Sequence, residues 1–249
     1  MERENGYMIP WEGPLPKPQV RTTDEIRSLL FDPDCIGPGM LYLMYRDLAR
    51  TRKERQWLSE HQLRYDITVI PPGVLCREYV KTKGHYHPDN PAGVGYPEVY
   101  EVLEGSAHYL LQNRNLSDIV LFSAGKGDKV IIPPGYGHVT INPSRQTLTM
   151  ANLVSTAFLS DYREYEALRG AAYYELEGET FTKNPHYPDI PVLRRRGPSD
   201  TGNLLPDGPL YAMIGSESLS FLNRPEEYSD KLSRLTKDDG QEDVCAHSS

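Results

Sequence analysis

Two closely spaced histidines, a glutamate and a third histidine are the residues of this sequence best suited to chemistry. His85 and His87 are two residues apart, a spacing that on a strand sends both imidazoles to the same face. Glu98 begins the next expected strand, and His138 follows the turn IIPPGYG on a third. Imidazoles with one carboxylate suit Fe2+, Mn2+, Ni2+ or Zn2+ better than Ca2+ or Mg2+. The alternative is that an isolated H-x-H pair is structural or lies at the surface.

Short strands are expected to position these side chains. The chain has 249 residues with 21 Pro, 20 Gly and 17 Tyr, a composition that favours strands joined by tight turns over an all-helical fold. Eight β-branched or aromatic runs, split by Gly, Pro or Asn, lie at residues 65–73, 77–82, 97–105, 107–112, 118–122, 128–135, 138–141 and 148–154. This density predicts a mainly β fold, a compact antiparallel barrel or jelly roll.

Helices are expected to flank the barrel at both ends of the chain. Capping signals, two of them with Glu three residues after Thr, predict helix starts at Thr22, Thr51, Ser160 and Pro225. Before the first of these, residues 1–20 are expected to form an extended arm without chemistry. We divide the chain into an arm with helices (1–64), a barrel with the metal site (65–182), and an extension with a helix and a frayed tail (183–249).

Charge and cysteine content limit the classes of function. With 27 Lys and Arg against 35 Asp and Glu, the net charge is -8, which offers no surface for nucleic acid. The one basic run, Arg194–Arg196, is expected to be a solvated turn. A basic N-terminal export signal and a run of ~18 apolar residues for a membrane span are both missing. The cysteines are odd in number and far apart, which argues against disulfides and for a cytoplasmic protein: Cys35, Cys76 and Cys245.

A longer motif around the third histidine connects the sequence to a known family. The motif G-x5-P-x-G-x2-H-x3-N is formed by Gly127, Pro133, Gly135, His138 and Asn142. Together with E-x6-G at Glu98, it resembles the two motifs of the cupin superfamily, which build a metal-binding β-barrel. Ten residues separate His87 from Glu98, more than in most cupins. This gap, between GHYH and EVY, is similar to that of the cupin-type glucose-6-phosphate isomerases of archaea and some bacteria, and the resemblance covers roughly residues 40–165.

This resemblance implies a role for each site residue. One divalent metal per subunit, Fe2+, Mn2+, Ni2+ or Zn2+, is implied at His85, His87, Glu98 and His138. Contacts to the substrate phosphate are implied at Thr68, Thr82 and Gly84. Tyr100 resembles the active-site tyrosine of the family, and Tyr162 resembles a second tyrosine near the substrate. Val154 stands at a position where the resemblance implies a further tyrosine. Without the resemblance, the threonines are typical strand formers, and Tyr100 and His108 typical barrel-lining residues.

The implied reaction is the interconversion of glucose 6-phosphate and fructose 6-phosphate, a step of glycolysis and gluconeogenesis. The metal would act as a Lewis acid on the O1 and O2 oxygens. Glu98 is the candidate base for proton transfer through a cis-enediol, and a hydride shift is the competing route. The alternatives are another cupin metalloenzyme, either an isomerase or epimerase of a different sugar or an iron dioxygenase, and a non-catalytic sugar-binding cupin. By analogy with small cupins, a homodimer is expected.

Overall fold

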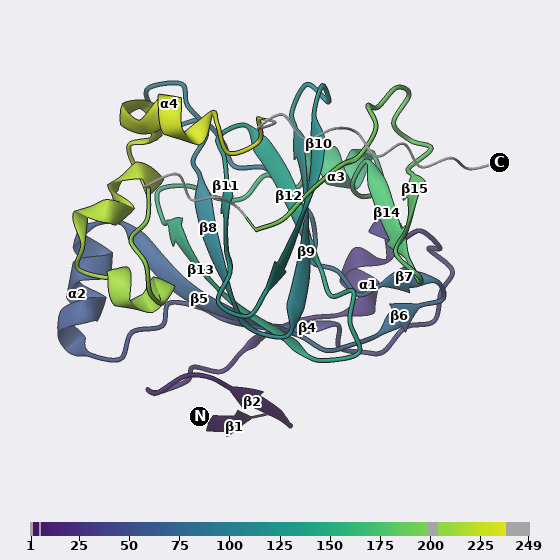
Figure 1. Ribbon diagram of the computed structural model, residues 1–249. Helices are drawn as coiled ribbons and strands as arrows, with labels where there is room; N and C mark the ends of the chain where they lie inside the picture. Colours follow the sequence, from purple (N-terminus) through teal and green to yellow (C-terminus); the bar gives the residue numbers. More distant parts are fainter. Residues whose placement is uncertain (1, 5, 199–203, 238–249) are drawn as a thin grey trace.

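Two β-sheets that face each other form the centre of the molecule (Figure 1). The computed structural model describes residues 2–4, 6–198 and 204–237. The larger sheet has the order β11 (Lys129–Ile132), β8 (Glu98–Glu104), β13 (Leu148–Ser155), β5 (Leu63–Ile70), β4 (Tyr42–Tyr45) and β3 (Gln19–Arg21). The smaller sheet has the order β12 (Tyr136–Ile141), β9 (Ser106–Asn113), β10 (Ile119–Gly125) and β16 (Arg194–Arg196). The mainly β jelly roll is confirmed, although in the described part of the chain its sheets do not close into a barrel.

Alternating apolar residues explain why these strands pack as two layers. Successive side chains of a strand point to opposite faces, so Tyr100 and Val102 of β8 face the interior while Val99 faces outward. Across the interior they meet Tyr109 and Leu111 of β9 in one buried cluster. Each of these side chains is at most 6% exposed. Burial of this kind stabilises the fold by roughly 1.5–3 kcal/mol for each large side chain.

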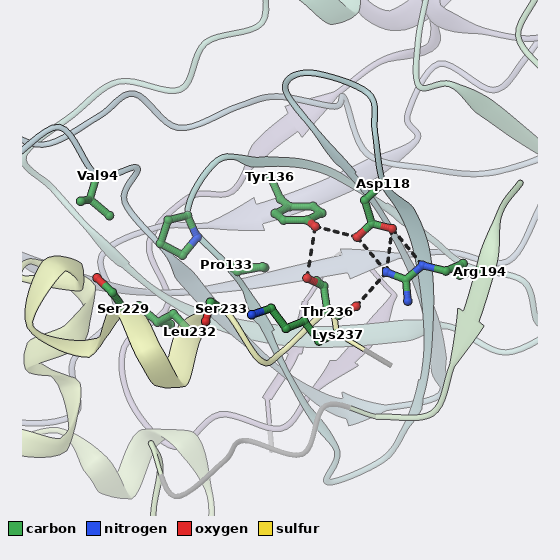
Figure 2. Close-up of a pocket in the computed structure, with 11 residues that line it drawn as sticks. Val94, Asp118, Pro133, Tyr136, Arg194, Ser229, Leu232, Ser233, Thr236 and Lys237 are labelled. Carbon is green, nitrogen blue, oxygen red and sulfur yellow. Dashed lines mark hydrogen bonds and ion pairs between the residues drawn. The ribbon is translucent and has the colours of Figure 1, made fainter. Parts of the chain in front are cut away.

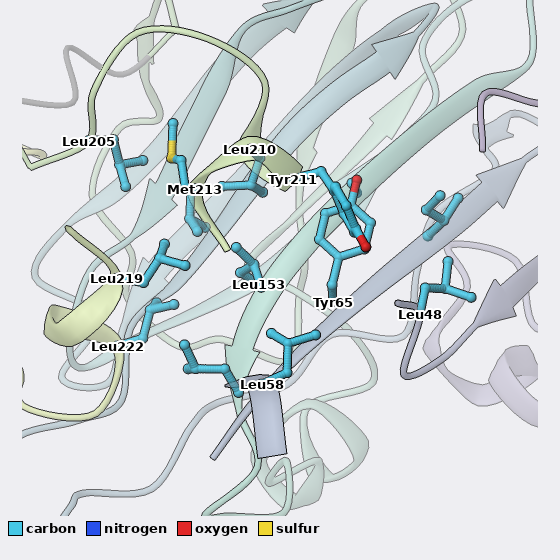
Figure 3. Packing of buried hydrophobic residues seen from close by; sticks show 14 of the residues in the cluster. Leu48, Leu58, Tyr65, Leu153, Leu205, Leu210, Tyr211, Met213, Leu219 and Leu222 are labelled. Atoms are coloured by element: carbon cyan, nitrogen blue, oxygen red, sulfur yellow. The ribbon is translucent and has the colours of Figure 1, made fainter. Parts of the chain in front are cut away.

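The C-terminal extension covers the outer face of the larger sheet. Its short helices are η2 (Leu210–Met213), η3 (Glu217–Leu222), η4 (Pro225–Tyr228) and α4 (Ser229–Leu232). Leu210 and Leu222 from these helices pack with Tyr65 of β5 and Leu153 of β13 in a second buried cluster (Figure 3). The outward face of the sheet is therefore buried like its inward face, which is why β13 is buried along its whole length.

Most of the expected helices are present, with some shifted boundaries. Capping boxes begin α1 (Thr23–Ile26), which continues into η1 (Arg27–Leu29), and α2 (Arg52–Glu60), as expected from the sequence. The start expected at Ser160 is wrong, because α3 (Arg163–Ala167) begins after Tyr162 without a side-chain cap. Residues expected to be an arm include a hairpin of β1 (Glu2–Glu4) and β2 (Tyr7–Ile9). Among the described residues, no helix has the length and apolar content to cross a membrane.

The expectation that the cysteines do not pair is wrong. Cys35 and Cys76 form a disulfide with their Cα atoms 5.8 Å apart, although they are 41 positions apart in sequence. Cys76 lies in the turn between β6 (Val74–Leu75) and β7 (Glu78–Tyr79), which pair with β14 (Tyr173–Leu176) and β15 (Thr180–Lys183) in a third sheet. Spacing along the chain could not show that the fold brings this turn to Cys35. The cysteines therefore no longer indicate that the protein resides in a reducing compartment such as the cytoplasm. Cys245 lies outside the described residues.

The basic run expected to be a solvated turn is also placed differently. Arg194–Arg196 is strand β16, which pairs in parallel with β10 at the edge of the smaller sheet. Arg194 is bound to Asp118, with Nη2 2.6 Å from Oδ1 and Nε 2.9 Å from the same oxygen. This ion pair explains the difference, because Asp118 neutralises a charge that would otherwise favour water over a sheet edge.

Candidate metal centre and substrate cavity

The structure brings the four suggested metal ligands together. One ligand atom each from His85, His87, Glu98 and His138 lies within 4.8 Å of all the others. A β-bridge joins His85 to His138 on β12, and Glu98 begins β8 of the facing sheet. The Nε2 atoms of His85 and His87 are 3.2 Å apart, and Glu98 Oε2 lies 3.4 Å from Nε2 of both His87 and His138. Three ring nitrogens and one oxygen thus surround one point between the sheets.

Hydrogen bonds around this group leave the inward atoms of His87 and Glu98 free for a metal. His87 Nδ1 lies 2.9 Å from the carbonyl oxygen of Tyr96, so this nitrogen carries the proton and Nε2 has the lone pair. Asn152 donates to Glu98 Oε1 at 2.7 Å, whereas Glu98 Oε2 is buried without a hydrogen-bond partner. A buried carboxylate oxygen without a partner is costly unless a cation binds it. The donor set therefore fits a divalent transition metal.

The electrostatics of the group also favour metal binding. Burial alone would raise the pKa of Glu98, but the neighbouring imidazoles of His138 and His87 outweigh it and hold that pKa well below its ordinary value. Burial, reinforced by the two neighbouring histidines, lowers the pKa of His85 well below its ordinary value. Burial likewise lowers the pKa of His138. Near neutral pH the site thus offers the carboxylate of Glu98 and the neutral imidazoles of His85 and His138, the forms that bind metals.

These shifts predict that the metal-free protein loses stability on acidification. The pKa values of His85 and His138 are lower in the folded than in the unfolded state, so below about pH 6.5 the unfolded chain binds more protons. We expect the free energy of unfolding to fall by on the order of 1 kcal/mol per pH unit for each group. Urea unfolding of EDTA-treated protein between about pH 7 and 5 measures this slope.

A pair of histidine substitutions provides the control for this slope. His85→Gln should make it shallower, whereas His61→Gln should leave it unchanged, because His61 lies outside the centre and stacks on Trp57. If the unfolding free energy of His85→Gln depended on pH as steeply as that of the unsubstituted protein, the assignment of this dependence to His85 would be contradicted.

A cavity next to the metal group contains most of the residues implied in substrate binding. Thr68, Thr82, Tyr100 and Tyr162 all line it. Gly84 is not among the lining residues, and its lack of a side chain has a packing reason. A Cβ at Gly84 would lie 2.3 Å from the ring of the buried Tyr165. Of its atoms, only the backbone amide remains as a contact for phosphate.

The structure adds polar cavity residues that were not expected from the sequence. Arg21 and Lys83 line the cavity near Tyr42, whose hydroxyl accepts the backbone N–H of Lys83 at 3.1 Å. Arg46 and Arg64 also line it. Arg64 could have been predicted from the sequence. It lies four residues from Thr68 on β5, and residues four apart on a strand point to the same face. Arg21 had no such signal, because β3 reaches the site only through its pairing with β4.

His108 does not belong to the metal group. Its Nδ1 lies 2.8 Å from Glu175 Oε1, and it is absent from the group of ligand atoms. This agrees with the expectation that His108 is not a ligand.

A larger cavity of about 540 Å³ lies between the smaller sheet and the C-terminal segment (Figure 2). Its polar side chains bind one another: Asp118 accepts from Arg194 and, at 2.6 Å, from the hydroxyl of Tyr136. Within the described residues, no second group of three or more His, Cys, Asp or Glu could hold a metal ion. We therefore place the chemistry in the cavity beside His85 and Glu98.

Sequence comparison connects this centre with known proteins. Residues 36–191 match the family model described as Glucose-6-phosphate isomerase (GPI). The curated glucose-6-phosphate isomerase of Pyrococcus furiosus is 36% identical over 84 residues, which cover 34% of this chain and 42% of the relative. That of Thermococcus litoralis is 35% identical over 132 residues, 51% of this chain and 63% of the relative. The chain thus spans about half the length of the curated relatives it matches.

Solved structures give a much weaker likeness. The oxalate decarboxylase of Lactobacillus farciminis in its formate complex aligns with a TM-score of 0.37 and 19% identity, over 51% of this chain and 33% of that chain. A vicilin from Capsicum annuum aligns with a TM-score of 0.34 and 14% identity, over 48% and 29% of the two chains. These values carry no argument about function.

Proposed function

The chain belongs to the glucose-6-phosphate isomerase family, and from this premise we propose that it interconverts glucose 6-phosphate and fructose 6-phosphate with the help of a divalent metal. The proposal depends on one observation above all. The buried, unpartnered Oε2 of Glu98 faces two imidazole nitrogens at 3.4 Å, within the segment that matches the family. Such an arrangement suits a bound cation beside a sugar cavity. The reaction is a step of glycolysis and gluconeogenesis.

A bound Fe2+, Mn2+, Ni2+ or Zn2+ would supply Lewis acidity toward the O1 and O2 oxygens of the sugar. The chain's own residues orient the groups around it. Asn152 holds one oxygen of Glu98, and the hydroxyl of Tyr100 lies 3.0 Å from His138 Nε2. Burial, together with the charge of Glu98, raises the pKa of Tyr100 well above 10, so its phenol stays protonated. We assign Tyr100 the role of hydrogen-bond donor to a sugar oxygen.

The phosphate end of the substrate is assigned to the opposite part of the cavity. Thr82 Oγ1 accepts the backbone N–H of Thr140 at 2.9 Å, which leaves its hydroxyl hydrogen to donate to a phosphate oxygen. We assign Thr68, Thr82, Tyr162 and the amide of Gly84 to phosphate binding. Lys83 lies beside this group, with its Nζ 4.6 Å from the centre of the Tyr162 ring, and its charge is paired with Glu166 at 2.6 Å.

Glu98 is assigned as the base that moves the proton between C1 and C2. Its low pKa keeps it ionised at neutral pH, and only the ionised form can accept a proton. We expect the product formed in D2O to carry deuterium at the carbon that receives the proton, which NMR or mass spectrometry of the product detects. Full retention of the substrate hydrogen would contradict this role and indicate a hydride shift.

We also propose that the protein is a homodimer. Apolar side chains remain exposed on the isolated chain, among them Ile36 at 95% and Leu159 at 89%. Such side chains suit a partner surface. Light scattering distinguishes a dimer from a monomer of 28.3 kDa.

A further inference from the structure

Two arginines share one buried carboxylate on the wall of the metal-site cavity. Nη1 of Arg46 and Nε of Arg64 lie 2.6 and 2.9 Å from the same oxygen of Asp66. The other oxygen of Asp66 accepts the backbone N–H of Asp47 at 2.9 Å. Asp66 is fully buried, whereas each arginine side chain is about one-third exposed and lines the cavity. One carboxylate balances one guanidinium, so this wall keeps a net positive charge.

The pairing of the strands places this charge beside the metal ligands. Val154 of β13 pairs with Arg64 on one side and with Glu98 on the other, and Asn152 pairs with Asp66 and Tyr100. Arg64 and Glu98 are therefore at the same height along the strands, with one strand, β13, between them. At this level, the side chain between Arg64 and Glu98 is that of Val154, which also lines the cavity.

The implied phosphate contacts lie at a different level of the same sheet. Thr68 is on β5, two residues from Asp66 and four from Arg64, on the same face. Two residues along a strand span about 7 Å, so Arg64 begins roughly 13 Å from Thr68. The metal ligand Glu98 lies nearer the arginine end. The cavity thus has a phosphate end and, separated from it along the strand, a second cationic end.

We propose that Arg46 and Arg64 form a second anion subsite, which binds a sugar phosphate with a second anionic group, phosphate or carboxylate, at the end remote from its first phosphate. The inference rests on the proposed function for the placement of the first phosphate. Nη2 of Arg46 has only the sulfur of Met44 within 3.0 Å, a weak acceptor that an anionic oxygen readily replaces. The charge of Glu98, which faces the same cavity, is balanced when a metal is bound.

Calorimetric titration of the metal-loaded protein with three ligands tests the subsite. Fructose 6-phosphate has one anionic group, fructose 1,6-bisphosphate has a second phosphate, and 6-phosphogluconate has a carboxylate. A charge-assisted contact gives about tenfold tighter binding or more, so both ligands with a second anionic group should bind at least that much more tightly than fructose 6-phosphate. A carboxylate can also bind the metal directly, and the bisphosphate arm separates that effect from the arginines.

Substitutions assign the preference to the two arginines. Arg46→Gln and Arg64→Gln should each reduce the preference for the bisphosphate to within a few-fold of fructose 6-phosphate, and Arg46→Lys should retain part of it. Each variant leaves one arginine on Asp66, so the fold should survive, and thermal melting verifies this. The matched control is Arg55→Gln, which removes the same charge from a pair with Asp47 outside the cavity.

The outcomes separate this inference from the proposed function. Equal affinity for fructose 6-phosphate and the bisphosphate, or a preference that survives both glutamine substitutions, would overturn the subsite. A preference limited to 6-phosphogluconate would also overturn it, because coordination of the carboxylate to the metal then suffices. Weak binding of fructose 6-phosphate, together with an arginine-dependent preference for the bisphosphate, would support the subsite and contradict the isomerase assignment.

Discussion

Glu98→Gln is expected to lower turnover of fructose 6-phosphate by about three orders of magnitude, because it removes several kcal/mol of stabilisation from the reacting oxygens. The substitution keeps the shape of the side chain but removes the charge that faces the imidazoles of His87 and His138. It also removes the proposed base. We further expect the purified variant to contain much less metal. Elemental analysis of the same sample that is used for the turnover assay measures this.

Glu104→Gln is the matched control for this experiment. Glu104 lies at the opposite end of the same strand, β8, and does not line the cavity, so the same change of charge there should leave rate and metal content unchanged. Circular dichroism and thermal melting of both variants establish that the fold is intact. Full turnover in Glu98→Gln would remove Glu98 from both of its proposed roles.

Gly84→Ala is expected to destabilise the protein and to weaken its metal site. The new Cβ would lie 2.3 Å from the Tyr165 ring and 2.7 Å from Val139. Tyr165 is fully buried, so its ring has no free space into which it can move. Overpacking of this kind costs about 1–3 kcal/mol in free energy of unfolding. Because Gly84 precedes the ligand His85, we also expect weaker metal binding, and urea unfolding with and without metal measures both effects.

Gly39→Ala controls for the loss of a glycine. No atom lies within 4 Å of a Cβ at Gly39, so this variant should be as stable as the unsubstituted protein or slightly more stable. Equal stability of Gly84→Ala and Gly39→Ala would contradict the prediction that close packing around residue 84 excludes a side chain.

The grouping of the proposed metal ligands could be predicted from the sequence because their spacing already limits their geometry. His85 and His87 are two apart, so any extended backbone sends both rings the same way, and turn residues place His138 at a strand start. The capping box at Thr51 is equally local, and α2 follows it closely. Features of this kind depend on a few neighbouring residues, so tertiary structure changes them little.

Other parts of the site depend on contacts between distant segments. Arg21 reaches the cavity because β3 pairs with β4, and the Cys35–Cys76 disulfide joins residues that are 41 positions apart. Arg46 and Arg64 meet at Asp66 through the pairing of β4 with β5. Patterns along a single strand contain no information on which strand lies beside it, so these contacts appear only in three dimensions.

The departure at Val154 was visible in the sequence, but its surroundings were not. In the structure Val154 lies between Arg64 and the proposed metal ligand Glu98. A missing tyrosine alone suggests a weakened site, whereas in the structure the valine stands beside one of the two arginines proposed to bind a second anion. The meaning of the substitution therefore depends on its neighbours across the sheet.

The most direct test of the proposed activity is the conversion of fructose 6-phosphate to glucose 6-phosphate, followed with a coupled dehydrogenase before and after EDTA. We expect activity that EDTA abolishes and that Fe2+, Mn2+, Ni2+ or Zn2+ restores, in proportion to the metal bound at the centre of His85, His87, Glu98 and His138. Absence of conversion with every metal, in folded protein shown to hold one ion per chain, would contradict the isomerase assignment.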